Sequence, residues 1–369
     1  MCGNFGLIRS ARDPDPTVAS TIFAMLGCLA EHRGHDAAGF ALVTTSSQGT
    51  KPSSIAPLHP ISHRDVQIGH CRVVKDTRPW QALWHRRYLP ALHQATIVLG
   101  HTRHASQGAP DDLTGAAPMV VGAGLIGTHN GEIDADDLWR RLPPGLAPPH
   151  GDSDTERLLL ALDRVRGDLG AVCDVLSTMR GLAALAWVDR ARPHLAFLAR
   201  GALSPLALAW DTYGNLYWGS SPAWFRRLNA QSIDRRGLQV ELLAEGTVLV
   251  IATGDIPTVI AEHTFTPTAR PGDAENFPTL WLGLDPGDVA AFRAEARRPS
   301  LPKLPHRTQE LLQAGHSHGG FTLRQAEGFA QFARWPEDIL QTLAGKHHRF
   351  GPSLNGDLDV RHRPTGKAH

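Results

Sequence analysis

The first residue in the sequence with obvious chemical potential is Cys2, which directly follows Met1. Cys is small enough for the initiator methionine to be removed, and Cys2 would then be the N-terminal residue. A terminal cysteine holds a thiol and an α-amine in one residue. Because that amine has an ordinary pKa of about 7.7–8.0, it can take the thiol proton at neutral pH. The pattern is typical of a nucleophile that carries its own base, although a cysteine at position 2 is by itself more often incidental.

Four further groups of polar and glycine residues follow in order along the chain. With the first, they are Cys2-Gly-Asn-Phe-Gly6, Arg33-Gly-His-Asp-Ala-Ala-Gly39, Gly100-His-Thr-Arg-His-Ala-Ser-Gln-Gly108, Thr128-His-Asn-Gly131 and Asp152-Ser-Asp-Thr-Glu156. In this order the series closely resembles the glutaminase domain of the class II glutamine amidotransferases, a family within the N-terminal nucleophile hydrolases. The resemblance extends from Cys2 to about Phe265 and includes Leu203-Ser-Pro-Leu206 and Ser220-Ser-Pro222.

The resemblance implies a catalytic role for three residues. Cys2 would attack the side-chain amide carbon of glutamine and form a γ-glutamyl thioester, with its α-amine acting first as base and then as acid. The Asn130 side chain and the backbone N–H of Gly131 would form the oxyanion hole. Read without that context, Asn130-Gly131 is the strongest two-residue signal for a hairpin turn.

The resemblance also implies substrate-binding and supporting residues. Arg103 would hold the α-carboxylate of glutamine through a bidentate pair, and Asp154 would accept the α-ammonium group. The simpler interpretations are a surface ion pair for Arg103 and a first-turn acid that complements the helix dipole for Asp154. The supporting residues are Arg33, Gly34, Asp36 and His104. These assignments involve no metal and no cofactor.

The segment after Arg103 departs from the family pattern. The family often has Trp directly after this arginine and His three residues further on, whereas this chain has His104 and Gln107. In the family this segment closes over bound glutamine. We therefore expect the lid, rather than the bond-breaking step, to differ in this protein.

Short apolar runs and helical patterns indicate an α+β fold. The expected strands are Gly39–Thr45, Thr96–His101, Leu125–His129, Leu182–Asp189, Leu195–Arg200, Pro205–Trp210, Leu216–Gly219 and Thr247–Ala252. The expected helices are Thr17–Glu31, Ala135–Leu142, Thr155–Arg166 and Ala171–Met179. Ser153 and Glu156 form a capping-box pattern before the third helix, and the run from Gly181 to Ser220 reads as successive antiparallel strands. The resemblance implies a four-layer αββα sandwich of two antiparallel sheets with a mostly helical C-terminal appendage.

The composition excludes several classes of protein. The 369 residues have a formal net charge of +1, which does not favour a binder of nucleic acid or acidic membranes. The four cysteines have no C-x-x-C spacing, and Cys28, Cys71 and Cys173 lie in apolar stretches as small hydrophobic residues do. No apolar run is long enough to cross a bilayer, and Arg9 interrupts any signal-peptide core. We therefore expect a cytoplasmic protein.

The local amino-acid composition of the chain changes after Phe265. We expect a glutaminase domain over 2–265, a linker over 266–278, a helical extension over 279–345 and a disordered tail over 346–369. The extension includes helices from Asp285 to Arg298, from Thr322 and from Pro336 to Gly345. The pairs His316-x-His318 and His347-His348 are more typical of polar tail residues than of metal ligands.

The residues after 265 also bear on the partner of the reaction. They contain no G-x-x-x-x-G-K-[ST] loop and no acidic run that would bind phosphoribosyl pyrophosphate. We therefore expect a glutaminase subunit that acts on L-glutamine and supplies ammonia to a separate acceptor enzyme. Two alternatives stay open. One is a hydrolase of another γ-glutamyl amide, similar to the small amidohydrolase of ergothioneine synthesis, and the other is an inactive binding module of the same fold.

Overall fold

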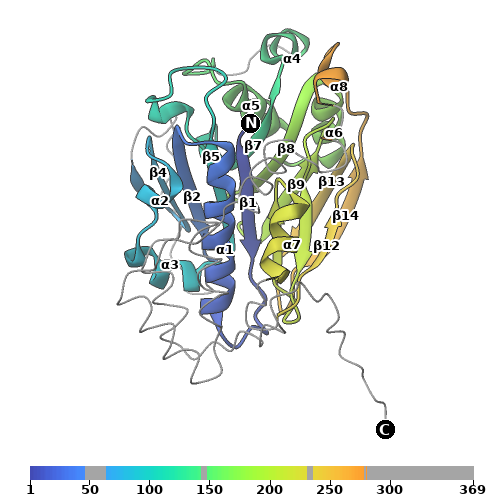
Figure 1. The fold of residues 1–369 in the computed structure, drawn as a ribbon. Coiled ribbons are helices and arrows are strands. Elements are labelled where there is room, and N and C mark those ends of the chain that lie inside the picture. Colours follow the sequence, from blue (N-terminus) through green and yellow to red (C-terminus); the bar gives the residue numbers. More distant parts are fainter. Residues whose placement is uncertain (46–63, 143–147, 231–235, 278–279, 281–369) are drawn as a thin grey trace, which may run out of the picture.

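The computed structural model describes residues 1–45, 64–142, 148–230, 236–277 and 280. Within this part of the chain, two antiparallel sheets pack face to face and helices cover their outer faces (Figure 1). The expected α+β sandwich of two antiparallel sheets is confirmed. The helices expected after residue 280 lie outside the described residues.

The first sheet has eight strands in the order β12-β10-β11-β1-β5-β2-β4-β3. Their bounds are β1 Gly3–Ile8, β2 Ala37–Val43, β3 Asp65–Ile68, β4 Cys71–Asp76, β5 Ile97–Arg103, β10 Ala207–Trp210, β11 Leu216–Gly219 and β12 Gln239–Leu242. The second sheet has six strands in the order β14-β13-β9-β8-β7-β6. Their bounds are β6 Met119–Val121, β7 Leu125–Ile133, β8 Gly181–Asp189, β9 Leu195–Arg200, β13 Thr247–Ala252 and β14 Thr258–Thr264.

The helices fall into two groups, one on each outer face. Against the first sheet lie α1 Pro16–Ala30, α2 Trp80–Leu83, α3 Leu89–Gln94 and α7 Pro222–Ala230. Against the second sheet lie α4 Ala135–Arg141, α5 Asp154–Val165 and α6 Leu169–Thr178. Single 3₁₀ turns occur at Glu31–Arg33, Arg86–Tyr88 and Leu113–Gly115, and the short helix α8 spans Asp273–Asn276.

Three apolar cores correspond to the three interfaces between the four layers. One joins the helices of the first group to their sheet, one fills the space between the sheets, and one joins the second sheet to α4, α5 and α6. Cys28, Cys71 and Cys173 are divided among these cores, one in each. The burial of apolar surface at all three interfaces fixes the distance between the layers.

Strand β1 lies inside the first sheet and is paired along both of its edges. Phe5 is opposite Gly219 of β11 on one side and Gly100 of β5 on the other. Its side chains alternate between the two cores, with Phe5 toward the helices and Ile8 between the sheets. The N-terminal segment is therefore held at the centre of the sheet rather than at an edge, where ends of chains usually fray.

Several expected elements have their expected bounds, and others were missed. Leu195–Arg200, Leu216–Gly219 and Thr247–Ala252 are strands with those ends, and the four expected helices agree within two residues. Strand β1 was not expected, because its two glycines and Asn4 weaken the strand pattern. Pairing with β5 and β11 determines its conformation instead.

One expectation of local structure was confirmed in large part, and another was wrong. The strands from Gly181 to Ser220 are antiparallel in the pairs β8–β9 and β10–β11, although β9 belongs to the second sheet and β10 to the first. Ser153 does occupy the N-cap of α5, but its side chain caps no N–H, so no capping box forms. The Glu156 carboxylate instead accepts hydrogen bonds from the backbone N–H groups of His150 and Gly151, at 2.9 Å each.

Residues 266–278 were expected to form a linker. The described part of this segment, 266–277, lies against the domain. Thr268 bridges to Arg180, and Arg270 forms ion pairs with Glu132 at 2.8 Å and with Asp273 at 3.2 Å. Among the described residues, no helix is long and apolar enough to span a membrane.

The core above the first sheet generates a stability prediction. Trp80 is fully buried, packs edge-on against Phe5, Phe23 and Phe40, and donates from Nε1 to the carbonyl of Ala24 at 3.1 Å. Trp80→Ala should lower the free energy of unfolding by about 3–5 kcal/mol, because it leaves a large cavity in the core. Chemical denaturation measures this loss.

The matched control for this prediction is Val259→Ala on strand β14, where the side chain is 42% exposed. It should change the free energy of unfolding by no more than about 0.5 kcal/mol. A loss below about 1 kcal/mol for Trp80→Ala would contradict the view that this core holds α1 and α2 on the sheet.

Candidate active site

The candidate nucleophile lies at one end of the sandwich, where β1 begins and β5 ends. Gly3 is opposite Thr102 in the antiparallel register, so Cys2 is beside Arg103 and His104. The backbone N–H of His104 donates to Cys2 Sγ at 3.3 Å, and the thiol lies 3.5 Å from the His104 carbonyl oxygen. Cys2 is half-buried at this end, near the N label in Figure 1.

Burial raises the pKa of the Cys2 thiol above its ordinary value. Hydrogen bonding from the His104 N–H, the positive N-terminal ammonium and the charge of Arg103 act in the opposite direction, while Asp154 adds to the increase. In this form of the chain, with Met1 in place, the thiol is held in its protonated state. A base beside the sulfur is needed to generate the thiolate.

The motif from Arg33 to Asp36 supports the segment that contacts the thiol. The Asp36 N–H donates to the Arg103 carbonyl at 3.0 Å, and its carboxylate accepts from the Ala105 N–H at 2.7 Å. A Cβ on Gly34 would lie 2.3 Å from the Arg103 carbonyl carbon, so only glycine allows this close approach. The His104 ring is exposed, with Nδ1 3.8 Å from the Asp36 carboxylate.

Arg33 supports the same end of the sandwich from another direction. Its guanidinium is buried, donates to the Ser220 carbonyl at 2.9 Å and lies 5.8 Å from the ring centre of Trp224. Ser220 in turn accepts the Asn4 N–H at 2.9 Å, so Arg33 contacts the residue that holds the start of β1.

Asn130 and Gly131 lie within strand β7 and do not form a turn. Asn130 is opposite Ala184 of β8, and Gly131 is opposite Ala183. The Asn4 side chain donates across the space between the sheets to the Ala184 carbonyl at 3.3 Å. The hairpin interpretation is therefore excluded, and Asn130 lies on the strand that faces β1.

The Asn130 side chain is fully buried, yet neither its Oδ1 nor its Nδ2 has a hydrogen-bond partner among the described residues. Leaving a buried polar group unpaired costs about 1–3 kcal/mol, and native proteins avoid it unless the group has another use. A buried amide with a free N–H is a suitable donor for an oxygen that gains negative charge during a reaction.

Gly131 is crowded on the side where other residues carry a Cβ. A Cβ there would lie 1.9 Å from the Leu182 carbonyl oxygen and 2.9 Å from His129 Nε2, and the φ angle is +155°. His129 itself is buried and fixed by Thr155 Oγ1, 3.1 Å from Nδ1. The strand can therefore pass this point only as glycine.

Asp154 begins helix α5 and is 6% exposed. Its Oδ2 accepts the Ile133 N–H at 3.0 Å, and its Oδ1 accepts the Thr155 N–H at 2.7 Å. The carboxylate thus joins the start of α5 to β7 just beyond Gly131. It also acts electrostatically on the Cys2 thiol, so it lies in the same site as the nucleophile.

The Arg103 guanidinium is 5% exposed and contacts three carbonyl oxygens of the segment that follows it. Nη1 donates to Ala109 at 3.0 Å and Asp112 at 3.2 Å, and Nη2 donates to Gln107 at 2.9 Å. Its described contacts are therefore not those of a surface ion pair. These bonds use three of the five guanidinium N–H donors, and two donors are left for a carboxylate among the described contacts.

Some residues of this site were missed by the sequence analysis. Asn4 connects the two sheets, because its Oδ1 accepts from Thr128 Oγ1 at 3.0 Å and from Trp218 Nε1 at 3.2 Å. Lys75 is buried and donates to the Ala116 carbonyl at 2.9 Å, and burial lowers its pKa to about 8. Asn4 lies in the first motif, and only its position beside the nucleophile could have signalled its role.

The buried His101 also lies in this region. Its Nε2 is 3.0 Å from the His129 carbonyl, and burial lowers its pKa to about 3. The ring therefore stays neutral at physiological pH and acts as a fixed hydrogen-bonding group between the sheets.

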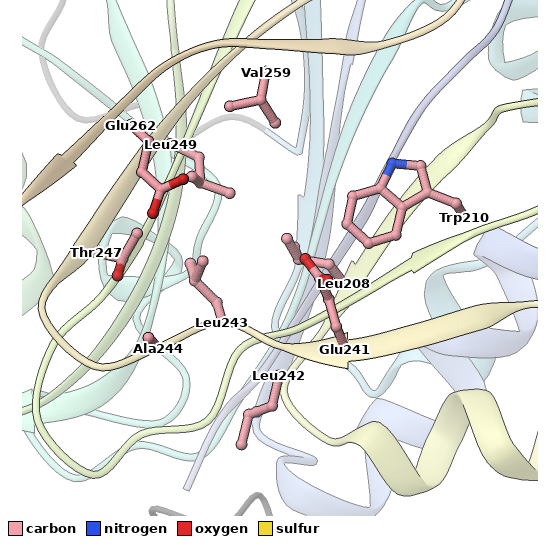
Figure 2. A pocket seen from close by; sticks show the side chains of 10 residues that line it. All are labelled: Leu208, Trp210, Glu241, Leu242, Leu243, Ala244, Thr247, Leu249, Val259 and Glu262. Carbon is pink, nitrogen blue, oxygen red and sulfur yellow. The ribbon is translucent and has the colours of Figure 1, made fainter.

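A pocket of about 310 Å³ lies elsewhere, between the edge strands of the two sheets (Figure 2). Its lining is mostly apolar, includes Trp210 and Leu249, and carries the carboxylates of Glu241 and Glu262. None of the site residues above lines it. Within the described residues, no group of three or more His, Cys, Asp or Glu is arranged to hold a metal ion. The His316 and His347 pairs lie outside the described residues.

Two antiparallel sheets packed face to face with helices on both outer faces are the fold expected of an N-terminal nucleophile hydrolase. In a comparison with solved structures, the chain superposes on "structure of the allosteric regulatory enzyme of purine biosynthesis" with a TM-score of 0.51 and 16% identity. The match covers 91% of this chain and 64% of the other, and it supports the fold.

Curated relatives give a more specific similarity. The chain is 24% identical over 264 residues to glutamine--fructose-6-phosphate aminotransferase (isomerizing) of Chlamydia pneumoniae, covering 70% of this chain and 37% of the relative. It is 29% identical over 214 residues to the enzyme of the same name from Pyrobaculum aerophilum, covering 56% and 31%. No family model matches the chain.

These similarities support the resemblance to the class II glutamine amidotransferases that the motifs indicated. The chain spans about a third of the length of the curated relatives that it matches.

The crowding around Gly131 generates a prediction. Gly131→Ala should shift β7 away from β8, because its Cβ would overlap the Leu182 carbonyl, and should destabilise the protein by about 1–3 kcal/mol or more. Gly167→Ala is the matched control, since a Cβ at Gly167 meets nothing within 4 Å. Thermal unfolding should show a clear decrease in Tm for the first variant and a change near zero for the second. Equal Tm values for both would contradict the close approach of the two strands.

Proposed function

We propose that this chain hydrolyses L-glutamine to glutamate and ammonia through a γ-glutamyl thioester on Cys2. The observation that carries the proposal is the buried amide of Asn130, which has no hydrogen-bond partner among the described residues and lies on the strand facing β1. Such a group is costly to keep unless a ligand uses it. The homology to glutamine amidotransferases supports the same assignment.

In this proposal the thiol of Cys2 is activated by its own α-amine after Met1 is removed. The raised thiol pKa makes that base necessary, because little thiolate forms without it. The thiolate attacks the side-chain amide carbon of glutamine. The α-ammonium then protonates the departing nitrogen, ammonia leaves, and water hydrolyses the thioester with the amine acting again as base.

The negative oxygen of each tetrahedral intermediate would be held by the Asn130 amide and the Gly131 N–H. Both are parts of a paired strand, so they need little reorganisation during the reaction. The two remaining donors of Arg103 would bind the α-carboxylate, and Asp154 would accept the α-ammonium group. Arg33, Gly34, Asp36 and His104 would keep the segment beside the thiol in place.

We propose further that the ammonia is used by an acceptor enzyme on a separate protein and that the protein is cytoplasmic. In this organisation residues 2–265 are the glutaminase domain, and the stretch after 278 is an extension with a role in packing or in docking the partner.

The proposal predicts that Cys2→Ala abolishes glutamine hydrolysis while leaving the fold intact. The Cys2 side chain is half-buried and contributes little to the cores, so Tm should change little. The control is Cys173→Ala in helix α6, which should keep full activity. Glutamate release measured alongside intact mass, which reports whether Met1 has been removed, checks both. Full activity in the Cys2 variant would overturn the mechanism.

A second prediction separates binding from chemistry. Arg103→Lys should chiefly raise KM, because a carboxylate contact is present in both the ground state and the transition state. Asn130→Ala should chiefly lower kcat, by about a hundredfold or more, because an oxyanion donor acts mainly in the transition state. Steady-state kinetics of both variants provide the test. Equal changes of kcat and KM in the two variants would show that the two roles are wrongly assigned.

A further inference from the structure

The side chain of Met1 packs into an apolar cluster at the active-site end of the sandwich. The cluster consists of the buried residues Leu182, Ala202, Leu203 and Leu280, with Ala269 and Phe277 against it. These residues come from β8, from the segment after β9 and from the segment around α8. Residues that are far apart in the sequence thus form one wall around the first residue of the chain. We call this wall the Met1 cluster.

The Met1 cluster adjoins the proposed oxyanion hole. Leu182 is opposite Glu132 in the β7–β8 pairing, and its carbonyl oxygen is the atom that lies against Gly131. Leu182 therefore belongs to the cluster that packs against Met1, and its carbonyl oxygen lies against Gly131. On a second side of Met1, Arg33 Nη2 lies 3.9 Å from the methionine sulfur.

Within the Met1 cluster, the backbone conformation of Leu203 is imposed by its surroundings. Leu203 is the one non-glycine residue with a positive φ angle in the described chain, at 62°. Its N–H donates to Glu245 Oε1 at 2.8 Å, and Glu245 is 3.5 Å from Arg200 Nη2. A non-glycine residue in this conformation costs about 1 kcal/mol or more and persists only where its surroundings impose it, often at ligand-binding positions.

The chemistry of the proposed reaction determines where the leaving nitrogen of the substrate lies relative to the Met1 cluster. The nitrogen that leaves the substrate takes its proton from the Cys2 α-amine, so the two nitrogens must be within hydrogen-bond distance, about 3 Å. In the structure that same α-nitrogen is bonded to the carbonyl carbon of Met1, about 1.33 Å away. Once Met1 is removed, the direction that it occupied is open, and a substituent on the leaving nitrogen would extend there.

We infer that this site also hydrolyses L-γ-glutamyl amides whose amine carries an apolar group, and that the space occupied by Met1 is the subsite for that group. The inference rests on the proposed function, since it uses the Cys2 thioester. Cys2 Sγ bonds to the side-chain amide carbon (Cδ) of the glutamyl group, the C–N bond breaks, and the amine departs with the proton of the α-ammonium. Water then cleaves the thioester, giving glutamate, the free amine and the original thiol.

The Met1 cluster favours an apolar substituent for a physical reason. The side chains of the cluster itself carry no hydrogen-bonding group, and Arg33 Nη2 approaches Met1 from another side. Surfaces lined by such apolar side chains take up apolar groups in preference to water. Each methylene group transferred from water is worth about 0.8 kcal/mol, or about fourfold in an equilibrium constant. Because the Met1 side chain packs against this cluster, we expect it to accommodate a substituent of about the length of that side chain.

The test uses the full chain, prepared from a fusion protein that is cut directly before Cys2. Its substrates are L-glutamine and the L-γ-glutamyl amides of methylamine, ethylamine, propylamine and butylamine. The expected result is hydrolysis of the whole series, with kcat/KM rising by up to about fourfold for each added methylene. Release of glutamate is measured for every substrate.

Two variants locate the subsite. Ala269→Leu adds bulk at a partly buried position of the Met1 cluster and should remove the rise with chain length, while turnover of L-glutamine stays within about twofold. Ala261→Leu makes the same change on the remote strand β14 and should keep the rise. Leu280→Ala enlarges the space and should extend the rise to the pentylamine derivative, so the inference does not depend on one variant folding.

The possible failures are distinguishable. A protein that hydrolyses L-glutamine but gives a flat or falling series would overturn the subsite and leave the proposed function intact. A protein that begins at Cys2 and turns over neither L-glutamine nor any amide would overturn the proposed function itself. A rise with chain length that persists in Ala269→Leu would place the apolar group elsewhere and also overturn the inference.

Discussion

The hydrogen-bonded pairing of β1 with β5 and β11 is the constraint on which the rest of the site depends. A residue near the start of a chain is usually mobile, but Phe5 is paired on both sides of its strand. Cys2, directly before β1, is therefore held at the end of a strand in the interior of the first sheet. The same pairing with β5 brings Arg103 and His104 to the thiol. One strand that is paired on both edges can therefore fix the position of a nucleophile at the end of a chain.

The second sheet contributes the buried amide of Asn130 to the site, and keeping that amide unpaired costs free energy. Asn130 is buried without a partner among the described residues, which costs about 1–3 kcal/mol for each unsatisfied group. The apolar surface buried in the three cores offsets this cost. The cores also hold β1 and β7 at a fixed distance and pack the helices onto the sheets. Asn4 adds a direct connection, because its side chain bonds to Thr128 and Ala184 of the facing strands. Well-packed cores thus surround a site in which the Asn130 amide has no hydrogen-bond partner among the described residues.

The charges at the site act on the thiol in opposite directions. Arg103 and the N-terminal ammonium favour the thiolate, whereas burial and the carboxylate of Asp154 favour the thiol, and the net effect is a raised pKa. The cysteine is therefore kept protonated until a base acts on it, which protects it from unwanted reactions. The apolar wall formed by Leu182, Leu203 and Leu280 packs against Met1, the residue directly before the cysteine.

Several features of the protein could be determined from the sequence by itself. The order of the five motifs indicated the family, and apolar periodicity located helices such as α1 and strands such as β9 and β13, because these patterns depend on near neighbours. Sequence could not decide whether Asn130-Gly131 is a turn or a strand, since both conformations suit the pair. Only pairing with β8 decided it. Nor could local pattern place β1, assign β9 and β10 to different sheets, or bring Leu280 to Met1. Those outcomes depend on contacts between residues far apart in the chain, whose energies are absent from any local window of sequence.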